Sequence, residues 1–130
     1  MSCSGDNLKS MTVTINGWSA KSISIPNPFR AVDAIEFAHV KFVRATVQVE
    51  NNSQFVQARA TLRYTNDKLN YDTPIALTSY QSGNGTVYGS WADVTTGAKL
   101  FAELNVEVQN SSGTAVEMGQ ITVRYDFRGV

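Results

Sequence analysis

A strict alternation of apolar and polar residues limits what this chain can fold into more than any other feature. It runs through residues 43–50 and again through residues 56–64. The apolar positions are Val43, Ala45, Val47, Val49, Val56, Ala58, Ala60, Leu62 and Tyr64. Successive side chains of a strand point to opposite faces, so each stretch predicts a strand with one dry and one wet face. Such strands are typical of antiparallel sheets.

Two stretches near the C-terminal end, residues 100–108 and 121–128, repeat the pattern. Their apolar positions are Leu100, Ala102, Leu104, Val106, Val108, Ile121, Val123, Tyr125 and Phe127. On the wet faces we expect Glu103 and Glu107 to lie beside Arg124 and Arg128. Solvated ion pairs of that kind contribute roughly 0–1 kcal/mol each.

Shorter alternating stretches complete the pattern. Residues 11–15 and 23–25 predict two strands, the second ending at Pro26 because Pro26 and Pro28 cannot donate a backbone hydrogen bond. Two more candidates are residues 75–80 and 86–91, and residues 28–37 and 92–99 have the spacing of at most a short helix. The total of about eight short strands predicts an all-β fold, an antiparallel β-sandwich.

The length of 130 residues fits one domain. Residues 1–10 are small and polar, which predicts a flexible N-terminal arm before a single β-sandwich domain at residues 11–130. The first ten residues lack the apolar segment of a signal peptide, and no apolar run approaches the roughly 18 residues of a membrane span, so we expect no membrane insertion.

Residues suited to catalysis or metal binding are scarce. One cysteine, Cys3, and one histidine, His39, give neither an intrachain disulfide nor a zinc cluster. We therefore predict no enzyme activity, no catalytic residues and no cofactor. The oxygen-rich segment 65–72, which contains Asn66 and Asp72, suits either calcium or an ordinary turn.

Five aromatic residues fall in or beside predicted loops, namely Trp18, Tyr71, Tyr80, Tyr88 and Trp91. They suit a platform on which sugars stack, or a contact with protein. We predict Trp18 and Trp91 to be partly buried between subunits.

Several segments, in order, resemble the shell domains of small icosahedral plant RNA virus coat proteins. They are residues 58–67 with Asp72-Thr73-Pro74, residues 79–80 with 85–91, and residues 100–108 with 119–127. Together they cover about the last two-thirds of the chain, and the first is a strand ending in an aromatic residue and an aspartate before a polar loop with a proline. The resemblance implies a single jelly-roll fold and a structural, self-assembling capsid protein of the virion.

The chain departs from that family in two ways. The family's coat proteins usually carry a basic N-terminal arm that neutralises RNA, whereas residues 1–10 contain one lysine and one aspartate. The chain is also short for the family's shell domain, so a penton or surface protein of a bacteriophage fits equally well. The turns at residues 51–54 and 109–114 suit either hairpins within one sheet or crossings between two sheets.

The charge balance bears on partners. Eleven basic and eleven acidic side chains give a net charge of +0, which favours self-association into a homo-oligomer or shell. The alternative function is a carbohydrate- or receptor-binding β-sandwich module.

We predict that the chain binds generic single-stranded RNA weakly at physiological salt, because few phosphates can be neutralised. Titration of a labelled RNA at several salt concentrations checks this. A submicromolar affinity that falls steeply with added salt would restore an RNA-packaging role.

Overall fold

The computed structural model describes residues 8–16, 19–20, 23–30, 35–36, 40–50, 54–94, 100–114, 116–117 and 119–129. All of the regular structure in these ranges is β-strand. They contain no helix, and hence none long and apolar enough to cross a membrane. Where residues 28–37 and 92–99 are described, the helical alternative is wrong, because each described part pairs with a neighbouring strand.

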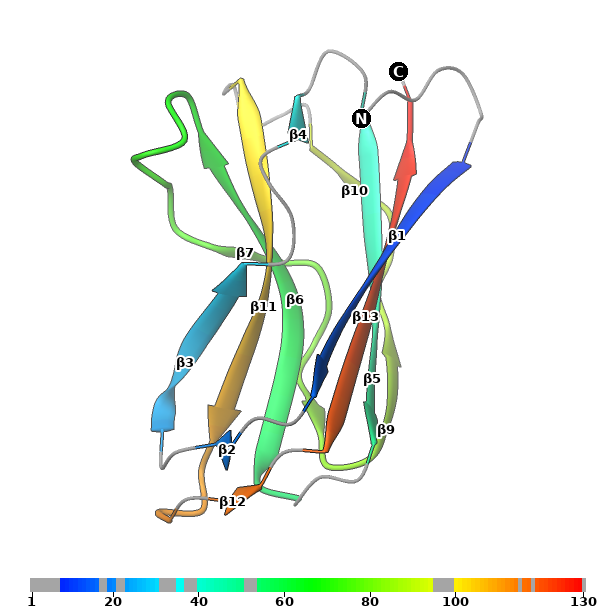
Figure 1. The fold of residues 1–130 in the computed structure, drawn as a ribbon. Helices are drawn as coiled ribbons and strands as arrows, with labels where there is room; N and C mark the ends of the chain where they lie inside the picture. The colour runs from blue at the N-terminus through cyan, green and yellow to red at the C-terminus, as the bar shows by residue number, and fades with distance from the viewer. Residues whose placement is uncertain are drawn as a thin grey trace.

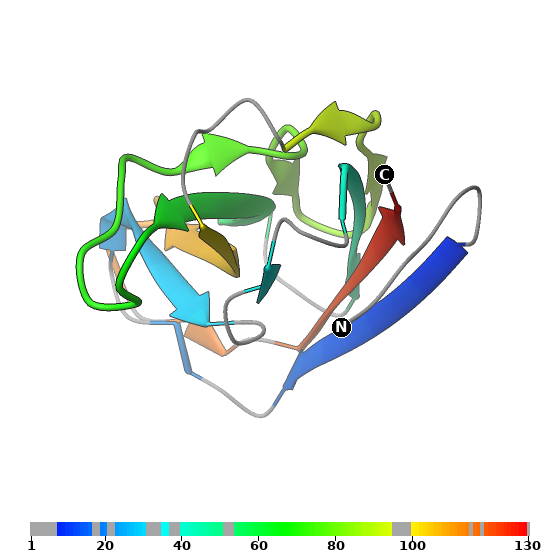
Figure 2. The same cartoon turned by 90° about the horizontal axis from the view of Figure 1, so that it is seen from above.

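The strands form two antiparallel sheets that face each other as two layers (Figures 1 and 2). Sheet one contains, in spatial order, β1 (Leu8–Asn16), β13 (Gln120–Arg128), β5 (Phe42–Glu50) and then both β9 (Gly85–Tyr88) and β10 (Ala92–Asp93). Sheet two contains β3 (Ile23–Arg30) and β4 (Ile35–Glu36) on one side of β11 (Phe101–Asn110), then β6 (Val56–Thr65), β7 (Ile75–Ala76) and β8 (Gln81–Ser82). A small ribbon pairs β2 (Ser19–Ala20) with β12 (Val116–Glu117).

The order of the strands settles the topology that the sequence left open. β5 lies in sheet one and β6 in sheet two, while β11 lies in sheet two and β13 in sheet one. Both connections therefore cross between the sheets instead of closing hairpins within one. Antiparallel strands that pass repeatedly between two packed sheets in this order form a jelly roll.

The predicted dry faces meet between the sheets and form one core. The apolar positions of β5, β6, β11 and β13 are buried, as the alternation predicts. Leu100 is the exception, since it stands one residue before β11 and is 63% exposed. The hydroxyl of Tyr125 crosses the core and donates a hydrogen bond to the carbonyl oxygen of Asn105 at 2.7 Å, and burial raises its pKa.

The prediction that a strand ends at Pro26 is wrong. β3 continues to Arg30 and pairs with β11, with a shift of register between Val108 and Asn110. Among the described residues β3 has a partner strand on one side only, and an edge strand tolerates proline because a missing N–H on its open side breaks no ladder.

β1 also differs from expectation, because it begins at Leu8. The last three residues of the predicted arm, Leu8 to Ser10, pair with β13. Residues 1–7 lie outside the described residues.

The predicted ion pairs on the wet faces have different partners from those expected. Glu103 and Glu107 of β11 pair with Arg63 and Arg59 of β6, at 2.9 and 2.8 Å, because β6 is the hydrogen-bonded neighbour and β13 lies in the other sheet. These carboxylates are not solvated either, since Glu103 is 3% and Glu107 4% exposed.

We predict that Leu62→Ala and Val123→Ala each lower the free energy of unfolding by about 2–4 kcal/mol, because both residues are buried and the change leaves a cavity. Urea unfolding midpoints check the values. Arg124→Ala is the control and stays within about 1 kcal/mol, since its side chain is half-exposed and Asp126 keeps Arg44.

We expect Arg63→Ala to lower the free energy of unfolding as the core variants do, and not to behave like the control Arg124→Ala. It removes a guanidinium from a buried carboxylate, so we expect a loss of about 2 kcal/mol. Equal midpoints for Arg63→Ala and Arg124→Ala would contradict this assignment.

Candidate interaction site at the sheet edge

The site lies along one side of the sandwich, where the last strands of the two sheets are both interrupted. In sheet two, residues 77–80 separate β7 from β8, and in sheet one, residues 89–91 separate β9 from β10. Backbone hydrogen bonds still tie the interruptions to the sheets. Leu77 N donates to Ala60 O at 2.8 Å, and Gly89 N donates to Ala45 O at 2.9 Å.

Gly89 lets the two interruptions approach each other. A Cβ atom at this position would lie 2.3 Å from the carbonyl oxygen of Leu77 and 3.0 Å from that of Ala45. Both neighbours are backbone atoms and cannot swing aside, so only glycine fits between them. The close approach joins the edge of one sheet to the edge of the other.

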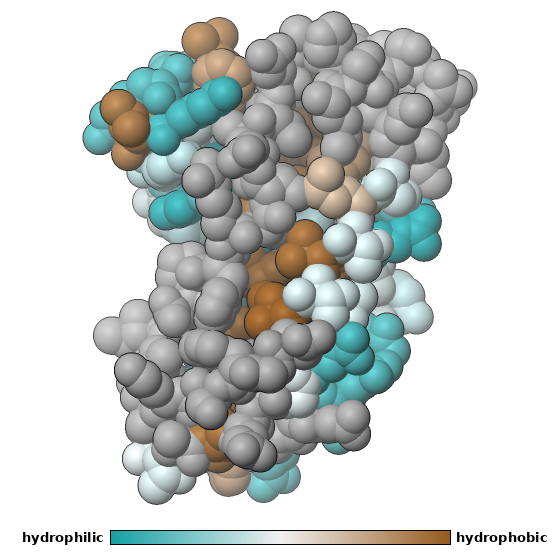
Figure 3. All heavy atoms as spheres, viewed as in Figure 1, coloured by the Kyte–Doolittle hydropathy of each residue, from teal (hydrophilic) through white to brown (hydrophobic). Residues whose placement is uncertain are grey.

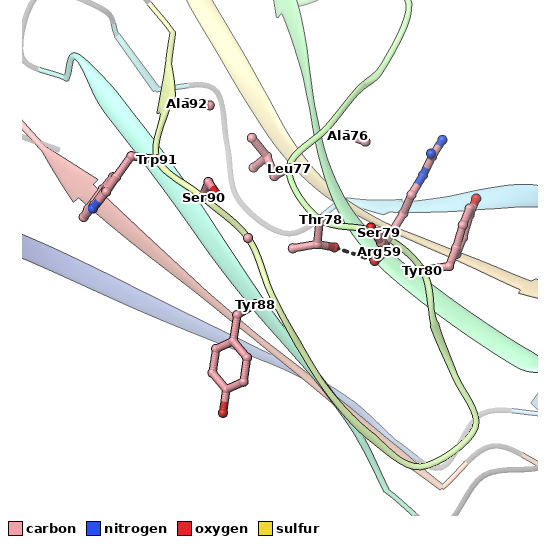
Figure 4. A pocket seen from close by; sticks show the side chains of 11 residues that line it. Arg59, Ala76, Leu77, Thr78, Ser79, Tyr80, Tyr88, Ser90, Trp91 and Ala92 are labelled. Atoms are coloured by element: carbon pink, nitrogen blue, oxygen red, sulfur yellow. Dashed lines mark hydrogen bonds between the residues drawn. The ribbon is translucent and has the colours of Figure 1, made fainter.

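A depression of about 700 Å³ opens over this junction (Figure 4). Its lining includes the buried Leu77 and Thr78 and the exposed Ser90, and Thr78 Oγ1 accepts a hydrogen bond from Ala60 N and donates one to Ser79 O. Figure 4 shows Tyr88 and Trp91 extending to one side and Tyr80 with Arg59 to the other. The aromatic side chains therefore flank the depression and do not converge in it.

On the side of sheet two, the rim is a charged and aromatic cluster. The Arg59 guanidinium lies 4.6 Å from the centre of the Tyr80 ring and pairs with Glu107 at 2.8 Å. The Tyr80 hydroxyl donates to the same carboxylate at 3.4 Å. Burial and the negative charge of Glu107 raise the pKa of Tyr80, against the opposing charge of Arg59. The hydroxyl therefore stays a hydrogen-bond donor at neutral pH.

On the side of sheet one, the rim residue Trp91 is supported by a polar network around Asp126, which is 3% exposed. Its carboxylate accepts hydrogen bonds from Arg44 at 2.8 Å, Ser10 at 2.7 Å and Arg124 at 3.0 Å. Burial alone would raise the pKa of Asp126, but the hydrogen bonds from Arg44 and Ser10 and the charges of both arginines outweigh it and lower the pKa. Arg44, held in this way, stacks on Trp91 at 4.4 Å from the ring centre.

The structure brings together three of the five aromatic residues singled out from the sequence, namely Tyr80, Tyr88 and Trp91. Tyr71 lies elsewhere, with its ring under the Arg63 guanidinium at 4.6 Å. Trp18, His39 and Cys3 lie outside the described residues.

Sequence reasoning missed Arg44 and Arg59, which order two of these rings. Both stand on the polar positions of alternating strands, where the pattern gives no sign that one arginine is special.

The segment considered for calcium forms a turn. Asp67 accepts hydrogen bonds from the backbone amides of Leu69 and Asn70 at 2.8 Å each, and from the Asn70 side chain. The hydrogen bonds from Asn70 and Leu69 lower the pKa of Asp67. Asn66 accepts a bond from Leu100 N at 3.0 Å, so its amide oxygen also serves the chain itself. In the described part of the chain, no three His, Cys, Asp or Glu residues gather as metal ligands would.

Comparison with known proteins finds a likeness in structure only. No protein-family model matches, and no curated protein matches. The VP2 subviral particle of infectious bursal disease virus matches with a TM-score of 0.65 and 9% identity, over 98% of this chain and 34% of that chain. A D431N mutant VP2 protein from T=1 particles of the same virus matches with a TM-score of 0.55 and 9% identity, over 97% of this chain and 37% of that one.

A structure of the Gx strain of this virus gives a TM-score of 0.56 at 9% identity, over 96% of this chain and 37% of that chain. The chain thus spans about a third of the length of these viral structures. At this identity the likeness establishes a shared fold, and the sandwich expected from the sequence is confirmed as one found in viral capsid structures.

We predict that acid destabilises the protein partly through Asp126. A carboxyl with a lowered pKa stabilises the fold fully above its unfolded pKa, near 3.8, and loses this contribution as pH falls through the lower folded pKa. Thermal unfolding between pH 7 and pH 2 checks this, and Asp126→Asn should flatten the acid limb. An acid limb that is identical in Asp126→Asn and the unchanged protein would contradict the assignment.

Proposed function

We propose that the chain is a structural subunit that self-assembles through protein–protein contacts into a shell of virus-capsid type, as a coat, penton or surface protein of a virion. One observation carries the proposal. Nearly the whole of this chain matches in fold about a third of VP2, which was solved as a subviral particle and in T=1 particles. In this role the protein performs no catalysis, and its work is done by its surfaces.

The balance of charge supports self-association. The net charge is +0, and the charged groups beside the depression pair within the chain, Arg59 with Glu107 and Arg44 with Asp126. Copies of such a subunit approach one another without the long-range repulsion that a highly charged surface would impose.

The depression at the sheet edge is the subunit contact that we propose. Trp91 is half-buried beside it and Tyr88 is 77% exposed, and aromatic side chains are enriched in the cores of interfaces. Arg44 fixes the Trp91 ring from one side, so docking a second subunit on the ring costs little side-chain entropy. Trp18, the other predicted contact, lies outside the described residues.

The carbohydrate- or receptor-binding alternative also has an observation in its favour. Tyr88 borders a second hollow of about 260 Å³ on the outer face of sheet one. The other residues that line it carry hydroxyl, amide and guanidinium groups, namely Thr12, Thr46, Gln48, Thr122 and Arg124. An aromatic ring beside such groups suits a sugar, which stacks its apolar face and hydrogen-bonds through its hydroxyls.

We predict that the purified protein forms large assemblies, seen by size exclusion with light scattering and by electron microscopy. In a Trp18→Phe variant Trp91 is the sole tryptophan. Its emission should then shift to longer wavelength on dilution, because dissociation exposes the ring to water.

The opposite result is equally clear. A protein that stays monomeric at high concentration, with emission independent of dilution, would overturn the shell proposal and favour the binding module.

A further inference from the structure

Two sheets have four edges, and in the described residues three of them carry prolines or very short strands. β3 carries Pro26 and Pro28, β7 and β8 have two residues each, and the edge of sheet one that holds β9 and β10 is broken by residues 89–91. Short strands, prolines and charged side chains are among the devices by which proteins prevent further strands from adding to a sheet.

The fourth edge, β1, is neither short nor interrupted by proline. It runs unbroken for nine residues, Leu8–Asn16, contains no proline, and has Lys9 as its single charged residue. Among the described residues, β1 pairs with β13 and with no strand on its other side. Its open side therefore presents a continuous row of backbone donors and acceptors.

From residue 10 to residue 15, the side chains of β1 alternate between its two faces. Ser10, Thr12 and Thr14 are exposed on the outer face, whereas Met11, Val13 and Ile15 pack against the core while remaining partly exposed. Figure 3 shows a brown apolar strip beside pale residues in the middle of this side of the molecule, in the region through which β1 runs in Figure 1.

This sequence is complementary to itself. If two copies of β1 lie antiparallel with Thr12 opposite Thr12, then Ser10 faces Thr14 on the outer face and Met11 faces Val13 on the inner face. Pairs of hydroxyl-bearing residues and pairs of apolar residues both stabilise neighbouring strands. Lys9 falls opposite Ile15, so no like charges are opposed. A slip by one residue would set the apolar face of one copy against the polar face of the other.

We propose that β1 is a docking edge for β1 of a second copy of this chain, in a two-fold dimer centred on Thr12 that joins two copies of sheet one into a continuous sheet. A two-fold axis perpendicular to the sheets keeps both apolar faces on one side, so the Met11, Val13 and Ile15 side chains of the two copies form one longer strip. The contact ends at two copies, because each β1 edge pairs with the other and neither is left open to a third chain.

A charge exchange at position 12 tests the axis. Thr12→Lys alone and Thr12→Glu alone each place two like charges directly opposite each other, so each should raise the dimer dissociation constant at least tenfold in sedimentation velocity. Mixing the two variants should restore the dimer, because lysine then faces glutamate. Thr86→Lys is the matched control, since Thr86 is exposed on β9 at the other edge of the same sheet.

A cysteine pair tests the register without adding charge. In a Cys3→Ser background, Thr12→Cys should give a disulfide-linked dimer under mild oxidation, because opposed residues lie within reach of such a bond. Thr14→Cys should give far less, since the two copies of residue 14 are four residues apart along the strands, about 13 Å.

A protein that stays monomeric at high concentration, a mixture that is no more dimeric than its components, or equal cross-linking at positions 12 and 14 would each overturn the dimer. These outcomes are separate from those of the shell proposal. A dimer without large particles supports the β1 contact and contradicts the shell. Large particles that the Thr12 variants leave unaffected support the shell and contradict the β1 contact.

Discussion

The pairing of β11 with β6 is the contact on which the rest of the structure depends. Its register runs without a break from Phe101 opposite Thr65 to Asn110 opposite Val56. On the inner face it sets Leu104 against Leu62, and on the outer face it sets buried glutamates against arginines. A slip of one residue would turn the apolar row outward and the ion pairs toward the core, so this ladder fixes which face of sheet two points inward.

The second sheet is attached to that ladder partly by a polar bond through the core. Tyr125 of β13 reaches across to the backbone of Asn105 on β11. A buried hydroxyl without a partner is costly, so this bond selects one lateral position of the sheets over others that would bury a similar apolar area. The apolar core supplies most of the stability, and the tyrosine adds specificity.

The alternation predicted the strands and the inward-facing side of each long strand, because burial on one face leaves a period of two in the sequence. It did not predict the crossings between sheets, since residues such as Asn51 and Ser111 suit a hairpin and a crossing alike. It also misplaced the partners of Glu103 and Glu107, because an ion pair depends on which strands are neighbours. Position along one strand carries no such information, and for the same reason the arginines that support Tyr80 and Trp91 were not found.

The backbone contact at Gly89 separates the geometry of this surface from its chemistry. The separation of the two sheets at this edge is set by main-chain atoms, Gly89 against the carbonyl oxygen of Leu77, and not by the bulk of side chains. Substitutions at Tyr80, Tyr88 or Trp91 therefore leave the spacing of the sheets at this edge unchanged while altering the chemistry of the depression. The spacing of the sheets and the chemistry of the surface therefore depend on different residues. A change of side chains can alter which partner binds without altering the backbone of the edge.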